Sequence, residues 1–253
     1  YVTLEPCSTS GRTPPCTHAI IRAGISRVVV AATDPNPEHA GRAFRWLKRK
    51  GIAVEHGLLA EQAAEINVAF NHWITAGLPF VTVKAAMTLD GKIATASGES
   101  KWITGPQARA HVHAQRARAD AILVGGGTWR ADRPRLDVRL PGLEHHAPQR
   151  IVLTRGVAPD GVRVINTPAQ IAALEALYLY VEAGADIAAS LLADDLVDRL
   201  EIYRAPIVIG GGRGAVSDFG LAALDDAHGR WALVERRQLG SDSFEAYSRQ
   251  RQE

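Results

Sequence analysis

Two cysteines lie close together in the stretch YVTLEPCSTSGRTPPC at residues 1–16. Cys7 follows a short run that predicts a strand, and Cys16 follows Pro14 and Pro15, which favour the start of a helix. The positive end of a helix dipole favours thiolate, the form of cysteine that binds metal. The spacing therefore leaves two readings open, a zinc site or a pair of inert thiols.

Further candidates for chemistry follow in the later part of the chain. Residues Thr88–Ser100 form a glycine- and hydroxyl-rich segment between a predicted strand and a predicted helix, where polar ligand groups usually dock. The glycines of IGGGRG at 209–214 lack the spacing of a dinucleotide-binding loop and open no domain.

Strand and helix patterns alternate along the whole chain, which predicts an α/β fold. The predicted strands are 1–4, 26–32, 52–57, 80–86, 120–128, 150–154, 162–166 and 177–184, with β-rich structure over 196–249. The predicted helices are 16–24, 39–51, 59–76, 105–119 and one from about 168. Thr104 is a plausible N-cap or near-cap of the fourth helix, and Pro106 suits its first turn. The sequence GLP at 77–79 breaks the pattern and predicts domains 1–77 and 78–253.

Two places in the chain suggest that residues are missing. The chain opens inside a predicted strand with no initiator methionine, and Met87 is its only methionine. Between Leu177 and Tyr178 a helix pattern passes into a strand pattern without a turn residue, although such connections usually take about 2–6 residues. We therefore expect missing residues before Tyr1 and near 166–178, the latter to be excluded by an unbroken chain there.

Composition excludes several classes of protein. A formal net charge of +2 in 253 residues gives no basis for nucleic-acid binding. No apolar run approaches the roughly 20 residues of a membrane span, and there is no secretory signal. Two cysteines do not make a disulfide framework, which points to a reduced, cytoplasmic protein.

The stretch KAAMTLDGKIATASGESKWITG at 84–105 resembles the reductase domain of the bifunctional deaminase–reductase family of riboflavin biosynthesis. The resemblance continues through ADAILVGGGTWRADRPRLDVR and LYVEAGADIAASLL, from residue 80 to most of the remaining chain. It implies a dihydrofolate-reductase-like domain that uses NADPH to reduce a ribosylamino group of a pyrimidine ribosyl phosphate to a ribitylamino group. Remote binding of the phosphate would help to fix a near-attack geometry.

The resemblance also implies a set of site residues. Lys84 and Glu182 match positions that could assist the reaction. The implied substrate contacts are Ser100, Arg116, Leu136, Arg139 and Glu182. The two planar guanidinium groups among them suit a phosphate monoester, although spacing alone favours solvated arginines. The implied cofactor contacts are Ala86, Trp102, Thr128, Asp132, Gly184, Ala185, Asp186, Ile187, Ala188, Ala189 and Ser190. Arg133 departs from the acidic or amide residue that the family commonly has before this proline.

The N-terminal part resembles the zinc-dependent deaminase module of the same family, through LEPC, GRTPPC and DPNP. By that resemblance Cys7 and Cys16 would be two zinc ligands of a partial cytidine-deaminase-like domain, a hydrolase that deaminates a diaminopyrimidine ribosyl phosphate. The pattern also requires a His-x-Glu motif, which the sequence does not contain. His18 and His39 are poor substitutes, because no glutamate follows either of them at the second position.

Other interpretations remain open. The chain could be a reductase with a vestigial zinc module, or a non-catalytic nucleotide-binding protein on the same fold. A nucleic-acid base deaminase is disfavoured by the cysteine spacing and the low net charge. The resemblance further implies a homodimer through the reductase domain, with a small-molecule substrate and neither nucleic acid nor membrane as partner.

Overall fold

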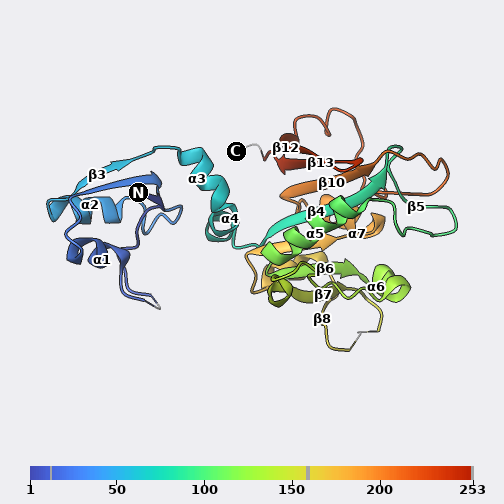
Figure 1. Ribbon diagram of the computed structural model, residues 1–253, viewed down its shortest axis with the longest axis horizontal. Coiled ribbons are helices and arrows are strands. Elements are labelled where there is room, and N and C mark those ends of the chain that lie inside the picture. The colour runs from blue at the N-terminus through green and yellow to red at the C-terminus, as the bar shows by residue number, and fades with distance from the viewer. Residues whose placement is uncertain (12, 158–159, 252–253) are drawn as a thin grey trace. The chain divides into compact units, whose positions relative to one another are not determined.

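A computed structural model describes residues 1–11, 13–157 and 160–251 of the chain. The chain divides into two compact units, Tyr1–Leu78 and Pro79–Glu253, which carry the blue-to-cyan and the green-to-red segments of Figure 1. The division lies one residue from the boundary that GLP at 77–79 predicts. Which functional domain each unit represents stays a prediction.

The first unit is built on a small parallel sheet with the strand order β1-β2-β3. Its strands and first helices are β1 (Val2–Leu4), α1 (Cys16–Arg22), β2 (Arg27–Ala32), α2 (Arg42–Arg49) and β3 (Ala53–His56). α2 buries Phe44 and Leu47 against Val28 and Val30 of the sheet. The alternation of short β-branched strands with amphipathic helices therefore forms one small core.

The helix predicted over 59–76 is interrupted. The structure has α3 (Ala60–Ile66) and α4 (Val68–Ala76), joined at Asn67 with φ −103° and ψ 17°. The Asn67 side chain donates to the Ala63 carbonyl at 2.9 Å. An asparagine that bonds to the preceding turn competes with the regular helix ladder, which explains the break.

The second unit is built on an eight-stranded sheet with the order β12-β13-β10-β4-β9-β6-β7-β8 (Figure 1). Its strands are β4 (Phe80–Thr88), β6 (Ala121–Gly125), β7 (Gln149–Leu153), β8 (Arg163–Ile165), β9 (Tyr178–Glu182), β10 (Arg199–Ala205), β12 (Trp231–Leu239) and β13 (Asp242–Arg249). The six strands from β10 to β8 run parallel, and the hairpin β12–β13 adds two antiparallel strands. The expected α/β fold with a large central sheet is therefore present.

Helices cover both faces of this sheet. On β6, Ile122 belongs to the core cluster under α5 (Pro106–Arg118), whereas Leu123 belongs to the cluster under α7 (Ala185–Ala193). Successive residues of a strand point to opposite faces, so an apolar strand contributes side chains to the core on each face of the sheet.

Two local predictions in this unit are wrong in detail, and the structure specifies a third. The glycine turn after β6 is the start of α6 (Gly126–Asp132). The predicted loop Thr88–Ser100 contains β5 (Lys92–Ala94), which pairs with β11 (Arg213–Gly214). Thr104 is not the N-cap of α5 but lies one residue before it, because the N-cap is Gly105, whose N–H donates to Asp242 Oδ2 at 2.6 Å.

The chain runs without a break from residue 166 to residue 178. The predicted helix is a 3₁₀ helix, η2 (Pro168–Ala173), and Leu174 with φ −83° and ψ 132° already leaves the helical conformation. Four residues then lead into β9. The helix therefore ends earlier than the sequence pattern suggests, and the expectation of missing residues near 166–178 stays a prediction. A further short helix is η1 (Glu144–His146).

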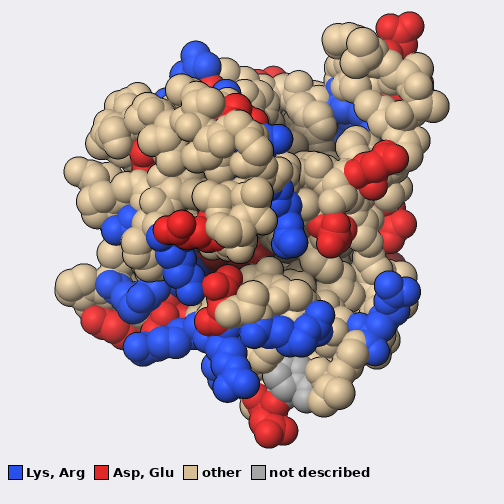
Figure 2. Space-filling model, turned by 90° about the vertical axis from the view of Figure 1, so that its right-hand side faces the viewer, with Lys and Arg blue, Asp and Glu red and all other residues tan. Residues whose placement is uncertain are grey.

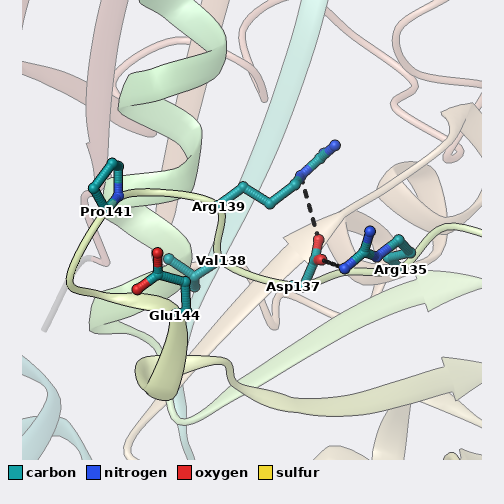
Figure 3. A pocket seen from close by; sticks show the side chains of 6 residues that line it. All are labelled: Arg135, Asp137, Val138, Arg139, Pro141 and Glu144. Carbon is teal, nitrogen blue, oxygen red and sulfur yellow. Dashed lines mark ion pairs between the residues drawn. The ribbon is translucent and has the colours of Figure 1, made fainter.

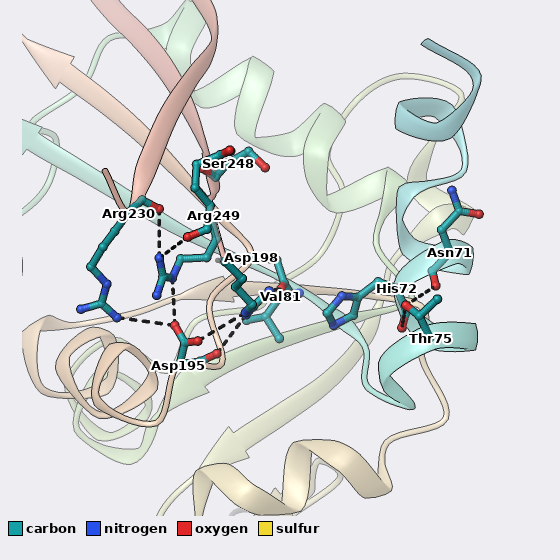
Figure 4. Close-up of polar contacts among 11 residues, drawn as sticks. Asn71, His72, Thr75, Val81, Asp195, Asp198, Arg230, Ser248 and Arg249 are labelled. Carbon is teal, nitrogen blue, oxygen red and sulfur yellow. Dashed lines mark hydrogen bonds and ion pairs between the residues drawn. The ribbon is translucent and has the colours of Figure 1, made fainter. Parts of the chain in front are cut away.

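A buried carboxylate, that of Asp198, lies at one end of the large sheet and bonds to the start of β4. Asp198, 3% exposed, accepts the Val81 N–H at 2.8 Å, and Asp195 nearby pairs with Arg249 at 2.9 Å and Arg230 at 3.5 Å (Figure 4). These contacts bind the last strand to the start of β4. Among the described residues no helix has the length and apolarity needed to cross a membrane.

Candidate active site in the second unit

A cavity of ≈ 920 Å³ opens where β4, β6 and β9 end. Lys84 of β4, Val124 of β6 and Glu182 of β9 contribute to its lining. Carboxyl ends of neighbouring parallel strands meet at one edge of a sheet, which is where open α/β folds bind their ligands. The topology therefore gathers residues that lie almost 100 positions apart in sequence.

Eleven of the residues implied by the sequence resemblance line this cavity. They are Lys84, Ala86, Ser100, Trp102, Arg116, Thr128, Asp132, Leu136, Arg139, Glu182 and Gly184. They come from β4, β9, α5, α6, the segment before α5, the segment after α6 and the junction of β9 with α7. Their contacts with substrate or cofactor stay predictions, but the fold brings them to one place.

The remaining implied cofactor residues lie elsewhere. Ala185, Ala188 and Ala189 are buried in α7, and Ile187 packs against Gly125. Asp186 accepts a hydrogen bond from Ser217 Oγ at 2.6 Å. Of the segment Gly184–Ser190, only Gly184, the N-cap of α7, lines the cavity. The backbone N–H groups at the start of α7 are therefore the part of this segment suited to an anion.

An ion triad lies in the cavity wall. Glu182 Oε1 accepts from Arg116 Nε at 2.6 Å, and Glu182 Oε2 pairs with Lys84 Nζ at 3.4 Å. The three side chains are 10–15% exposed. Burial by itself would raise the pKa of Glu182, but the charges of Lys84 and Arg116 outweigh it and lower the pKa to about 2. Glu182 is therefore ionised at neutral pH, and it cannot act there as a proton donor.

Arg116 is anchored on two sides. Besides Glu182, its Nη1 donates to the Asp137 carbonyl at 2.9 Å. Burial would lower the pKa of Arg116, yet the charge of Glu182 and its hydrogen bond raise it. This guanidinium therefore links α5 to β9 and to the segment after α6 in the wall of the cavity.

Arg139 and Arg135 lie beside the triad at the rim. They flank Asp137, with Arg135 Nη2–Asp137 Oδ2 at 2.7 Å and Arg139 Nε–Asp137 Oδ1 at 3.4 Å, and line a second cavity of ≈ 400 Å³ (Figure 3). Both arginines also line the larger cavity. The Arg135 side chain is 79% exposed and the Arg139 side chain 54%, so both can turn toward an anionic ligand.

Basic side chains dominate the larger cavity. Eight lysines and arginines line it against two acidic residues, Asp132 and Glu182. Figure 2 looks onto the side of the molecule where β5 and α6 lie in Figure 1, and shows Lys and Arg side chains gathered in its lower half. Such a surplus of positive charge favours anionic ligands.

An aromatic ring lies at one side of the cavity. Trp102 is 65% exposed, and the Arg109 guanidinium lies over its ring at 4.8 Å. Lys101 pairs with Asp132 at 3.0 Å, which links this segment to the end of α6. The exposed ring offers a flat surface for another planar group.

The sequence analysis did not identify His113, which lies one helical turn before Arg116 on α5. His113 lines the cavity, and its Nδ1 accepts the Arg139 N–H at 3.2 Å. Burial and the charges of Arg116 and Arg139 lower its pKa. The sequence signal that could have identified His113 is its position three residues before Arg116, because residues three apart share a helix face.

Two glycines at the start of α6 are required by close packing. A Cβ on Gly125 would lie 2.6 Å from Ile187 Cγ1, and a Cβ on Gly126 would lie 2.7 Å from Thr154 Cβ. Gly127, which lines the cavity, has open space beside it. The first two glycines let strand and helix approach, and the third leaves room for a ligand.

Cys7 and Cys16 lie together in the first unit. Cys16 donates its backbone N–H to Cys7 Sγ at 3.1 Å, and the hydrogen bond between the side chains is the largest cause that raises the pKa of Cys16. Within the described ranges no group of three or more His, Cys, Asp and Glu side chains is placed to hold a metal ion. A catalytic zinc takes about three protein ligands, so this donor set does not fit the expected zinc site.

Comparison with known proteins gives a consistent result. Residues 79–244 match the family described as the RibD C-terminal domain. The chain is 40% identical over 286 aligned positions to the riboflavin biosynthesis protein RibD of Bacillus amyloliquefaciens, covering 96% of this chain and 76% of that one. The aligned region is longer than the 253-residue chain, so this relative has residues there that the present chain lacks.

Solved structures show the same similarity. RibD of Acinetobacter baumannii has a TM-score of 0.87 and 32% identity, covering 98% of this chain and 80% of that one. A diaminohydroxyphosphoribosylaminopyrimidine deaminase/5-amino-6-(5-phosphoribosylamino)uracil reductase from Thermotoga maritima has a TM-score of 0.84 and 28% identity, covering 98% and 78%.

Proposed function

This chain belongs to the RibD family of riboflavin biosynthesis proteins, and from that premise we propose that its large cavity is the active site of an NADPH-dependent reductase. The family places the chain among enzymes of riboflavin biosynthesis with a RibD-type reductase domain. The proposed substrate is 5-amino-6-(5-phosphoribosylamino)uracil, reduced at the sugar C1 of its open-chain imine. The observation that carries the proposal is the buried triad of Lys84, Glu182 and Arg116 in a cavity rich in basic residues.

The residues present suit a phosphorylated dinucleotide. Gly127 leaves open space in the floor, Gly184 begins α7 with its free N–H groups, and Trp102 exposes a flat ring. Thr128 and Asp132 complete the proposed contacts. NADPH, when bound, supplies the hydride for the reduction.

The chain's own groups have three tasks in this proposal. Arg139 and Arg135 bind the substrate phosphate at the rim, and binding there orients the distant reacting carbon. Glu182 stays ionised and holds Lys84 and Arg116 in place. Lys84 is the group that can give a proton to the substrate nitrogen, because Glu182 with its pKa of about 2 cannot.

The test follows NADPH absorbance with the deaminated substrate and with its 2,5-diamino precursor. We expect NADPH oxidation with the first substrate only. Lys84→Met should lower kcat by about 100-fold, as loss of a general acid does. Lys48→Met, an exposed lysine of α2 in the other unit, serves as the matched control and should retain full activity. Absence of oxidation with either substrate in the unmodified protein would refute the proposal.

Deamination is the second activity that the family suggests. The paired thiols of Cys7 and Cys16 support at most a partial zinc site, because the described residues supply no third ligand. We therefore expect the chain to release no ammonia from the 2,5-diamino substrate. Ammonia release that a zinc chelator abolishes and that Cys7→Ser removes would reverse this conclusion.

The expected homodimer has one structural support. β12 is an edge strand of the large sheet, and it exposes Leu233 and Val234, which are 51% and 49% exposed. We propose that a second copy covers this strand. Sedimentation of the protein and of Leu233→Glu checks it, since the variant should shift toward monomer, and a monomeric unmodified protein would contradict it.

A further inference from the structure

One buried carboxylate in the second unit takes no part in the mechanism described above. Glu201 of β10 is 3% exposed and lies at the edge of the apolar cluster that includes Ile122, Val124 and Phe244. A buried ion is costly, and apolar replacements of similar volume are often neutral or stabilising. A charged residue at this place therefore needs a reason other than stability.

The carboxylate of Glu201 joins three elements. Gln115 Nε2 of α5 donates to Oε1 at 2.7 Å, and Tyr180 Oη of β9 donates to Oε2 at 3.0 Å. Tyr203, on the same strand as Glu201, adds a longer bond to Oε2 at 3.4 Å. Its hydroxyl also bonds to Nδ1 of His111 on α5 at 2.8 Å. These bonds oppose the effect of burial, which is the largest cause of the raised pKa of Glu201.

The two elements that Glu201 joins are those that carry the salt bridge of the active site. Gln115 is adjacent to Arg116 on α5, and Tyr180 lies two residues before Glu182 on the same face of β9. Lys84 is in register with Glu201 on one side and with Glu182 on the other. Glu201 thus fixes α5 against β9 beside the point where Arg116 meets Glu182.

We propose that Glu201 is a positioning residue for the reduction, which ties α5 to β9 and so sets the geometry of the Arg116–Glu182–Lys84 triad. The inference rests on the proposed reductase function. It predicts that loss of the tie lowers kcat, with little change in NADPH affinity, because the hydrogen bonds of Glu201 reach Gln115, Tyr180 and Tyr203, none of which is proposed to contact the cofactor.

The first variant is Glu201→Gln, paired with the exchange Gln115→Glu/Glu201→Gln. In the single variant an amide with one oxygen replaces the carboxylate, so the Gln115 donor keeps no acceptor in its present orientation and Gln115 has to rotate its amide to pair with residue 201. In the exchange the residue 201 amide can accept from the tyrosines and donate to the new carboxylate. We expect the single variant to lose about 10- to 100-fold in kcat and the exchange to recover to within about fivefold.

Tyr180→Phe is the second variant, and it keeps the proposal testable if the exchange does not fold. It removes only the hydroxyl that reaches Glu201 from β9, and we expect a kcat loss of about threefold to tenfold. Tyr178→Phe on the same strand is its control, because the Tyr178 ring packs edge-on against Phe80, and its activity should be unchanged. Equal kcat values for Tyr180→Phe and Tyr178→Phe would overturn the proposal, as would a Glu201→Gln variant that only melts earlier.

Crystal structures of the variants separate this proposal from the proposed function. We expect the Arg116 Nε–Glu182 Oε1 distance, 2.6 Å here, to lengthen in Glu201→Gln and to return in the exchange. An unchanged distance in Glu201→Gln refutes the positioning role even if the enzyme is active. If the unmodified protein oxidises no NADPH, the proposed function fails, while the distances still decide whether Glu201 sets the triad.

Discussion

At the scale of single residues, Glu182 supplies the negative charge that pairs with two cations in the cavity wall. It is the common partner of Arg116 and Lys84, and all three side chains are nearly buried. A buried cation without its counter-charge costs much more than an exposed one. The triad therefore contributes to the stability of the folded protein as well as to the proposed chemistry.

Glu182→Gln should destabilise the protein by about 3–5 kcal/mol, because it leaves two nearly buried cations without their counter-charge. Urea unfolding measured by circular dichroism gives the change. Glu55→Gln is the control, since Glu55 pairs with Arg27 on the surface at 2.9 Å with 59% of its side chain exposed. The control should leave the unfolding midpoint nearly unchanged. Equal effects of the two substitutions would show that the triad is not a stabilising element.

His113 predicts a dependence of stability on pH. Burial, Arg116 and Arg139 lower its pKa in the folded state, so the unfolded state binds more protons near and below pH 6.5. Its contribution is therefore present above pH 6.5 and is lost as the pH falls toward the folded pKa. Glu182, with a pKa of about 2, stays ionised throughout this range.

The free energy of unfolding of the unmodified protein, measured in urea at pH 7.5, 6.5 and 5.5, should therefore fall more steeply than that of His113→Gln. Glutamine keeps a polar group at this position but does not titrate. Parallel curves for the two proteins would show that His113 does not contribute through its protonation.

At the scale of elements, the junction of β6 and α6 decides the shape of the cavity floor. Gly125 lies against Ile187 of α7, and Gly126 lies against Thr154 after β7. These contacts set how closely α6 approaches its neighbours. Gly127, one position further, faces open space and lines the cavity.

Gly126→Ala should destabilise the protein by about 1–3 kcal/mol, because the added Cβ overlaps Thr154. Gly127→Ala should fold at least as stably as the unmodified protein, since alanine favours a helix and meets no atom there. The same substitution should weaken NADPH binding, measured by fluorescence titration, because it fills part of the cavity floor. Equal melting temperatures for the two variants would contradict this description of the junction.

At the scale of the whole molecule, the two units have separate cores. One cluster around Val30, Phe44 and Leu47 belongs to the first unit, and the two larger clusters belong to the second. Among the residues that the structure describes, all those that line the large cavity come from the second unit. The proposed reductase site therefore needs no side chain of the first unit in its lining.

We expect residues 79–251, produced alone, to fold and to oxidise NADPH with the deaminated substrate within about threefold of the full chain, because a unit with its own core can fold independently. Circular dichroism and NADPH absorbance measure the two properties. A folded but inactive fragment would mean that the first unit takes part in the reduction.

The sequence by itself predicted most of the strands and helices and a boundary near residue 78, because these depend on local periodicity and turn residues. The residues expected around the cavity were implied by the resemblance of short motifs to a known family. The sequence could not predict the triad as a contact, since Arg116 and Glu182 lie 66 positions apart and Lys84 and Glu182 lie 98 apart. The same holds for the contact at the start of α5, where the N–H of the N-cap Gly105 donates to Asp242 Oδ2, 137 positions away. Only the tertiary structure decided these pairings, because the strand order of the sheet sets which distant side chains share one face and become buried together.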